Sequence, residues 1–337
     1  MIDPRCVKNL ERKGTFNILK MKAILSMLIF CLVLFIYLHV YFHLKTSDDL
    51  EVYEIEQPSK DKLEEICDLR QPVMFDFAVE RLMETFKRSI IGTTYGAFDI
   101  KIRDVSRAPS DDEELYIPMS YTSCISDLDA DSESKYIVEN NMDFLEETAL
   151  IKTFRYNDAF IRPYMVSSCL YDFITASKDT CTPFRYNVDY RNYFLATEGE
   201  VTIKLAPPKS ARYLYQETDY ENFEFRSPVN PWNVQQQYKP DFDKVKCLEV
   251  TLREGQMIYI PAYWWYSMSF TDKACLCNFK YRTYMNTVAV LPKLAMRVLQ
   301  SQNVKRRIAK SVEIGETPVT RHVDTDVAET NDNKKEN

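Results

Sequence analysis

The pattern of apolar and polar positions separates one N-terminal segment from the rest of the chain. No residue from Ala23 to Leu44 is charged, and as a helix this segment would span roughly 33 Å at about 1.5 Å per residue, the thickness of a bilayer core. A cleaved signal peptide is the alternative, but the apolar run is too long for one and no small-x-small cleavage site precedes residue 45. We therefore expect a transmembrane helix at residues 23–44.

The remainder has the pattern of one globular domain over residues 46–300, because no linker or low-complexity segment interrupts it. Helical spacing of apolar residues predicts a helix from Asp76 to Ser89 and another from Leu291 to Leu299. Between them, short apolar or alternating runs separated by turns at Gly199 and Gly255 predict strands. These runs cover residues 193–196, 201–206, 247–252 and 257–260. The pattern favours a mainly β domain with flanking helices, built as a sandwich or barrel.

Charges on either side of the apolar segment predict its orientation. Residues 1–22 carry six Lys and Arg residues against two acidic ones, whereas acidic residues dominate soon after Lys45. By the positive-inside rule, residues 1–22 are expected to be cytosolic. The domain is then expected to be lumenal, extracellular or on a virion membrane. The polar tail, residues 304–337, is expected to be disordered.

Composition excludes several classes of function. Fifty acidic residues against 43 basic ones give a net charge of −7, which disfavours nucleic acid as a partner. The six glycines cannot form a nucleotide-binding fingerprint, and the only histidines are His39, His43 and His322. A serine or cysteine nucleophile in the domain would therefore have no histidine base. We expect no cofactor and no metal.

Two motifs carry a resemblance to a known family. The first is Thr-Pro-Phe-Arg-Tyr-Asn at residues 182–187, and the second is Glu-Gly-Gln-Met-Ile-Tyr-Ile-Pro-Ala-Tyr-Trp-Trp-Tyr at residues 254–266. They resemble the JmjC and cupin-like 2-oxoglutarate oxygenases, whose motifs are Thr-Pro-x-His-x-Asp and Glu-Gly-Asp-x-x-x-Ile-Pro-x-x-Trp-Trp-His. The resemblance covers roughly residues 50–285 and implies a double-stranded β-helix, the cupin or jelly-roll fold.

The same resemblance implies that the iron ligands are missing. The family holds iron(II) with two histidines and a carboxylate, and the matching positions here are Arg185, Asn187 and Tyr266. A guanidinium has no lone pair to donate and stays protonated, so it would repel a metal. The chain thus resembles a degenerate family member. Arg185 is expected either to fill the former metal position or to capture an anion, with Asn187, Tyr266 or Asp189 as acceptors.

Five further residues are candidates to line the pocket. Thr182 and Asn192 match family positions near the cosubstrate, and Val201 stands where the family has the lysine that pairs with 2-oxoglutarate. Tyr263 and Trp264 would give the pocket an aromatic wall, although such residues belong more often to the core of a sandwich.

These observations predict a membrane-anchored, non-catalytic domain with a binding or structural role. Its partners would be the membrane and an unknown protein, glycan or anionic small molecule. One alternative is an active hydroxylase with an atypical metal site drawn from Asp189, Glu198 or cysteine thiolates; another is a glycan or peptide receptor. The combination of acidity, a domain without histidine and a membrane segment also resembles proteins of large DNA viruses.

Overall fold

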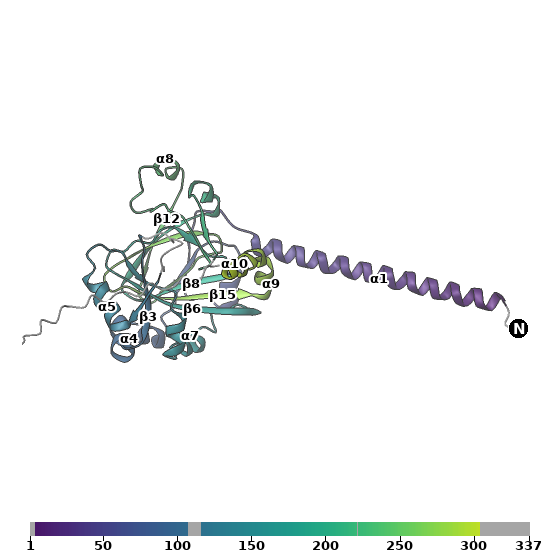
Figure 1. Cartoon of the computed structure of the whole chain (residues 1–337), viewed down its shortest axis with the longest axis horizontal. Coiled ribbons are helices and arrows are strands. Elements are labelled where there is room, and N and C mark those ends of the chain that lie inside the picture. The colour runs from purple at the N-terminus through teal and green to yellow at the C-terminus, as the bar shows by residue number, and fades with distance from the viewer. Residues whose placement is uncertain (1–3, 107–115, 221, 304–337) are drawn as a thin grey trace, which may run out of the picture. The chain divides into compact units, whose positions relative to one another are not determined.

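The N-terminal helix is longer than the apolar segment. In the computed structural model, which describes residues 4–106, 116–220 and 222–303, helix α1 runs from Pro4 to Leu44 and is the long purple helix of Figure 1. By length and composition, Lys20–Leu44 within it could cross a membrane. The basic residues before position 23 therefore continue the same helix. The expected disorder of residues 304–337 lies outside the described residues.

Two β-sheets form the body of the domain. The larger has nine strands in the order β1-β2-β13-β8-β15-β6-β5-β3-β4, and the smaller has six in the order β10-β11-β7-β14-β9-β12. The bounds of the strands are β1 Tyr53–Ile55, β2 Val73–Asp76, β3 Asp99–Asp104, β4 Ile117–Ser120, β5 Tyr136–Val138, β6 Val166–Ala176, β7 Arg185–Tyr186, β8 Arg191–Glu198, β9 Glu200–Ala206, β10 Glu217–Asp219, β11 Glu224–Arg226, β12 Leu248–Arg253, β13 Gln256–Tyr259, β14 Trp265–Phe270 and β15 Cys275–Thr283. Only β1 and β2 pair in parallel among the strand pairs of the described residues. This mainly β architecture with flanking helices confirms the expected fold class.

Side chains from both sheets meet in one buried layer. Ile174 and Phe194 of the larger sheet pack in the same cluster as Ile203 and Met268 of the smaller sheet. Alternate residues of each strand therefore point inward, as in other face-to-face sheet pairs.

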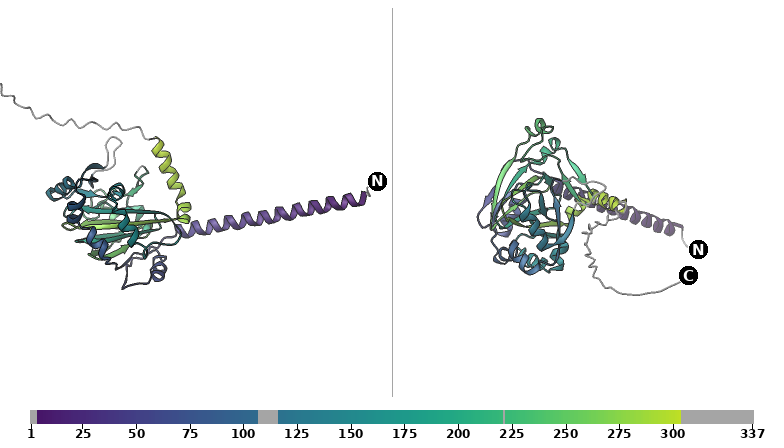
Figure 2. Two further views of the ribbon diagram at one scale, coloured as in Figure 1. Left: turned by 90° about the horizontal axis from the view of Figure 1, so that it is seen from below. Right: turned by 60° about the vertical axis from the view of Figure 1, so that its left-hand side comes forward.

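Helices cover the outer face of the larger sheet and gather on one side of the domain (Figure 2). Their bounds are α2 Lys60–Cys67, α3 Glu80–Thr85, α4 Arg88–Tyr95, α5 Tyr121–Ala130, α6 Met142–Glu147 and α7 Ile151–Asn157. A second apolar cluster joins them to the sheet through residues such as Phe86, Phe154 and Phe279. Elsewhere lie a 3-10 turn at Pro208–Tyr213, α8 at Lys239–Phe242, α9 at Tyr284–Ala289 and α10 at Leu291–Asn303.

The strand predictions are confirmed, and one helix prediction is wrong. The four predicted runs correspond to β8, β9, β12 and β13, and Gly199 and Gly255 turn between them with φ values of +70° and +83°. The single helix expected from Asp76 to Ser89 is instead the end of β2, α3 and the start of α4. Lys87 interrupts the helical pattern with an extended backbone, where the Glu198 carboxylate accepts the Arg88 N–H at 2.8 Å and satisfies the first turn of α4.

Candidate functional site

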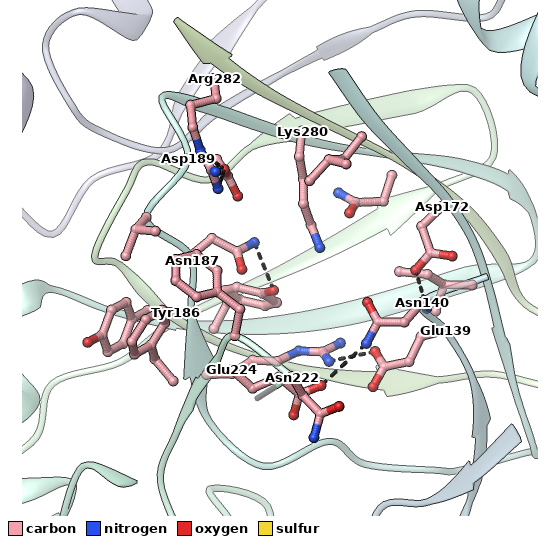
Figure 3. Close-up of a pocket in the computed structure, with 18 of the residues that line it drawn as sticks. Glu139, Asn140, Asp172, Tyr186, Asn187, Asp189, Asn222, Glu224, Lys280 and Arg282 are labelled. Atoms are coloured by element: carbon pink, nitrogen blue, oxygen red, sulfur yellow. Dashed lines mark hydrogen bonds and ion pairs between the residues drawn. The ribbon is translucent and has the colours of Figure 1, made fainter. Parts of the chain in front are cut away.

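A cavity of about 300 Å³ lies inside the domain and brings together the three positions that the resemblance assigns to iron. Arg185 of β7 pairs directly opposite Tyr266 of β14. The Asn187 side-chain amide donates to the Tyr266 hydroxyl at 3.2 Å, and the Arg185 guanidinium lies 5.4 Å from the centre of the Tyr266 ring. Figure 3 shows Asn187 among the side chains that line this cavity.

The partner of Arg185 is Glu139, which the sequence analysis did not propose. An Arg185 Nη1 to Glu139 Oε2 distance of 2.5 Å marks a charged hydrogen bond, and both side chains are mostly buried. The acceptors expected from the sequence are wrong for this contact. The Asn187 and Tyr266 side chains bond to each other, and the Asp189 carboxylate binds Arg282 at 2.6 Å.

Among the described residues, Glu139 also belongs to a larger ion network with Arg103, Arg185 and Glu224, and Arg226 Nη2 lies 3.8 Å from Glu224 Oε2 at its edge. Glu139 follows the end of β5, and its Oε1 lies 2.7 Å from Nη2 of Arg103 on β3. Arg103 Nη1 in turn lies 3.0 Å from Oε2 of Glu224 on β11. Because β3 and β5 belong to the larger sheet and β7 and β11 to the smaller one, this ion network ties the two sheets together.

The ion network is fully charged at neutral pH. Burial alone would raise the pKa of Glu139, but Arg103 and then Arg185 outweigh it and hold this pKa below its usual value. Burial is likewise overcome at Glu224, where Arg103 and Arg226 lower the pKa to about 2. The pKa of Arg185 is raised, since Glu139 outweighs the burial that would lower it. Each charge is therefore stabilised by an opposite one.

The residues at the three positions do not fit iron(II). The Arg185 guanidinium is itself a cation, it is hydrogen-bonded to Glu139, and it has no lone pair for a metal. Asn187 and Tyr266 offer a neutral amide and a phenol instead of an imidazole and a carboxylate. Among the residues that the structure describes, no group of three or more His, Cys, Asp or Glu side chains is arranged to hold a metal. Asp189 and Glu198, the candidates for an atypical site, are occupied by Arg282 and by the Arg88 N–H.

Three of the proposed lining residues lie outside the cavity lining and have structural contacts. Thr182 is buried, and its hydroxyl oxygen accepts the Met268 N–H at 2.9 Å. Asn192 is buried behind the lining, where its oxygen accepts from Asn278 at 2.8 Å. Val201 is fully buried in the apolar layer between the sheets.

The two proposed aromatic lining residues also pack elsewhere. Trp264 is fully buried, and its indole N–H donates to the Arg70 carbonyl at 3.1 Å. Tyr263 has a φ of +68°, and its ring lies 5.9 Å from that of Tyr186. The aromatic wall of the pocket comes instead from other rings, including Phe194 and Tyr266, whose centres are 5.5 Å apart.

Strand β15 supplies polar lining residues that the sequence analysis missed. Asn278, Lys280 and Arg282 all line the cavity. They alternate along one strand, so their side chains share a face. The alternation of polar residues at positions 278, 280 and 282 can be read from the sequence, and it indicates that one face of this strand is polar.

Comparison with known proteins gives the family. A family described as "Cupin-like domain" matches residues 113–287, more than half of the chain. Two curated proteins, both named "HSPB1-associated protein 1", from Rattus norvegicus and Mus musculus, are each 29% identical to this chain over 82 residues. Those residues are 24% of this chain and 17% of each relative, so the match spans only a small part of the relatives. With the sheet topology and the family match in agreement, the chain belongs to the cupin-like domain family.

Proposed function

We propose that this chain is a membrane-anchored cupin-like domain that binds a ligand and has no oxygenase chemistry. The observation that carries the proposal is the contact between Arg185 and Glu139 at 2.5 Å, in the position where the resemblance places a metal ligand. A buried guanidinium that is held by a carboxylate already supplies the positive charge that iron would bring. A second cation at the same point would be repelled.

The cavity favours a binding role over a purely structural one. A domain kept only as a scaffold gains stability by filling its interior, since voids forfeit packing contacts. Here about 300 Å³ remains open and is lined by side chains that include Asn187, Asp189 and Lys280. Small-molecule sites have this size and a few convergent polar groups. A glycan or a small anion suits this lining.

The test is metal content and turnover in the full chain, purified in detergent without oxygen and loaded with iron(II). We expect iron at the background level and no conversion of 2-oxoglutarate to succinate. Stoichiometric iron together with turnover would overturn the proposal and favour the alternative of an active hydroxylase. In that case Asp189→Asn and Glu198→Gln identify whether the atypical carboxylates hold the metal, because each removes one candidate ligand charge.

The proposal includes an orientation for α1. The basic N-terminal flank favours a cytosolic N-terminus, which leaves the domain in a lumen, outside the cell or on the membrane of a virus particle. Protease added to sealed vesicles in their native orientation should then spare the domain if it is lumenal. A short epitope tag at the N-terminus serves as the control, because it should be digested in the same vesicles. Digestion of the domain with protection of the tag would reverse the orientation.

A further inference from the structure

The cations that line the pocket differ in their partners: Arg297 lies over the Phe223 ring, with its guanidinium 5.4 Å from the ring centre, and the others are described below. The guanidinium groups of Arg185 and Arg282 are neutralised by Glu139 and Asp189, as described above. Lys280 makes no ion pair or hydrogen bond with any residue that the structure describes, although it lines the cavity. Figure 3 shows its ammonium projecting from β15 toward the centre of the pocket. An ammonium with three donors and no acceptor among the described residues is suited to a ligand anion.

Asp172, an acidic residue of the same cavity, does not pair with Lys280. The Asp172 carboxylate accepts three backbone N–H bonds, from Asn140 at 2.7 Å, Asn141 at 2.9 Å and Phe173 at 3.0 Å. These bonds hold Asp172 against the wall of the pocket. Its carboxylate interacts with Lys280 only through space, so the ammonium stays available.

The amide side chains of the pocket present acceptors. Asn187 uses its NH₂ group on Tyr266, and Asn278 donates to Asn192 and to the Tyr193 carbonyl, each at 2.8 Å. No described residue donates to the side-chain oxygens of Asn187 and Asn278, and both residues line the cavity. These oxygens complement ligand groups that donate, such as hydroxyls.

We propose that the pocket binds a small polyhydroxylated anion, a sugar acid or a sugar phosphate. Its carboxylate or phosphate lies at Lys280, and its hydroxyls donate to the oxygens of Asn187 and Asn278. A volume of about 300 Å³ matches one monosaccharide-sized ligand, and the rings of Phe194 and Tyr266 offer apolar surface to its C–H groups. The inference rests on the proposed function, since a metal centre would occupy the same space.

The experiment measures binding to the full chain in detergent micelles by isothermal titration calorimetry, with four probes. Glucuronate and glucose 6-phosphate carry the anion and the hydroxyls, glucose lacks the anion, and 2-oxoglutarate lacks the hydroxyls. We expect glucuronate or glucose 6-phosphate to bind about tenfold or more tightly than glucose and 2-oxoglutarate, because each control leaves a pocket group unpaired. Which charged sugar binds more tightly separates a carboxylate site from a phosphate site.

Two variants of Lys280 and one control variant locate the anion of the ligand. Lys280→Met should weaken binding of the charged sugar about tenfold and leave binding of glucose unchanged, whereas Lys280→Arg keeps the charge and should retain the preference. Lys204→Met is the matched control: Lys204 lies on β9, outside the cavity lining, near Trp232 and Glu249. Its loss should not change binding. Thermal unfolding of each variant verifies that it is folded.

Three results overturn the inference: no charged sugar binds more tightly than glucose, 2-oxoglutarate binds most tightly, or Lys280→Met binds the charged sugar like the unaltered chain. Iron content measured on the same preparation shows whether such a result refutes the sugar-binding inference alone or the proposed function as well. Iron with 2-oxoglutarate turnover refutes the proposed function, whereas iron-free protein without sugar binding refutes the inference alone.

Discussion

Arg185 and Glu139 of the ion network are expected to contribute unequally to the stability of the domain. In Arg185→Met, Glu139 keeps a partner, because Arg103 remains 2.7 Å away. The loss is then one charged hydrogen bond, about 1.5–3 kcal/mol. In Glu139→Gln, Arg185 loses the one carboxylate that it contacts among the described residues and remains as a mostly buried, unpaired charge. Breaking a buried pair in this way costs about 3–5 kcal/mol. We therefore expect Glu139→Gln to destabilise the domain more than Arg185→Met.

Urea unfolding of the full chain in detergent, followed by tryptophan fluorescence, measures this difference. Trp264 and Trp265 are both buried, so their emission reports the unfolding of the domain. Arg253→Ala is the matched control, since Arg253 forms an ion pair with Glu200 at the surface and such pairs contribute little. The control should unfold at the same urea concentration as the unaltered chain.

The double variant tests whether the two residues act through each other. Once Glu139→Gln is present, the further change Arg185→Met removes the stranded charge, so its additional cost should be small or negative. The reasoning is refuted if Arg185→Met matches the control, or if the two single changes cost the same and add without coupling.

Other predictions follow from the same pocket. Restoring the ligand types of the family by Arg185→His, Asn187→Asp and Tyr266→His should lower the melting temperature of the metal-free chain, because Glu139 loses the charged hydrogen bond from Arg185; an unchanged melting temperature would show that this ion pair is dispensable. Burial raises the pKa of Asp172 from its usual 3.8 to about 6, so its contribution to stability is fully present below about pH 4 and is lost as the pH rises through 6, by about 3 kcal/mol. Urea unfolding between pH 4 and 7 should show this loss in the unaltered chain and not in Asp172→Asn; identical slopes would contradict the assignment. Since Lys280 lowers the pKa of Asp172, Lys280→Met should move the midpoint of this pH dependence upward, and an unchanged midpoint would show that the two groups do not interact.

The sequence predicted the strands and one cross-strand contact of the site, but not its ion pair. Arg185 and Tyr266 lie in two motifs whose spacing matches the family, and the structure confirms that they are opposite each other in neighbouring strands. Glu139 is separated from Arg185 by 46 positions and directly follows β5, a strand of the other sheet. No local periodicity links such residues, because the contact exists only after both sheets have packed. The demand of a buried arginine for a carboxylate was predictable from charge, whereas the identity of that carboxylate was not.

The aromatic residues illustrate a different limit. Trp264 and Tyr263 stand within a motif that resembles the family, and neither lines the cavity. A run of adjacent aromatic residues indicates apolar surroundings, but both the core and a pocket wall provide these. The indole N–H of Trp264 found its acceptor in the Arg70 carbonyl, far away in the sequence. Which face of the chain a ring occupies is therefore decided by tertiary packing.

The ion network of Arg103, Glu139, Arg185 and Glu224 also restricts how this sequence can diverge. A descendant that loses the arginine at position 185 or the glutamate at position 139 alone keeps an unbalanced charge inside a packed protein, and selection against that intermediate is strong because folded proteins have little stability to spare. These positions should therefore change together across related lineages. Several less stable intermediates separate a lineage that carries the ion network from one that carries three metal ligands. Once a lineage has replaced the metal site by the internal ion network, a return to the metal site is therefore disfavoured.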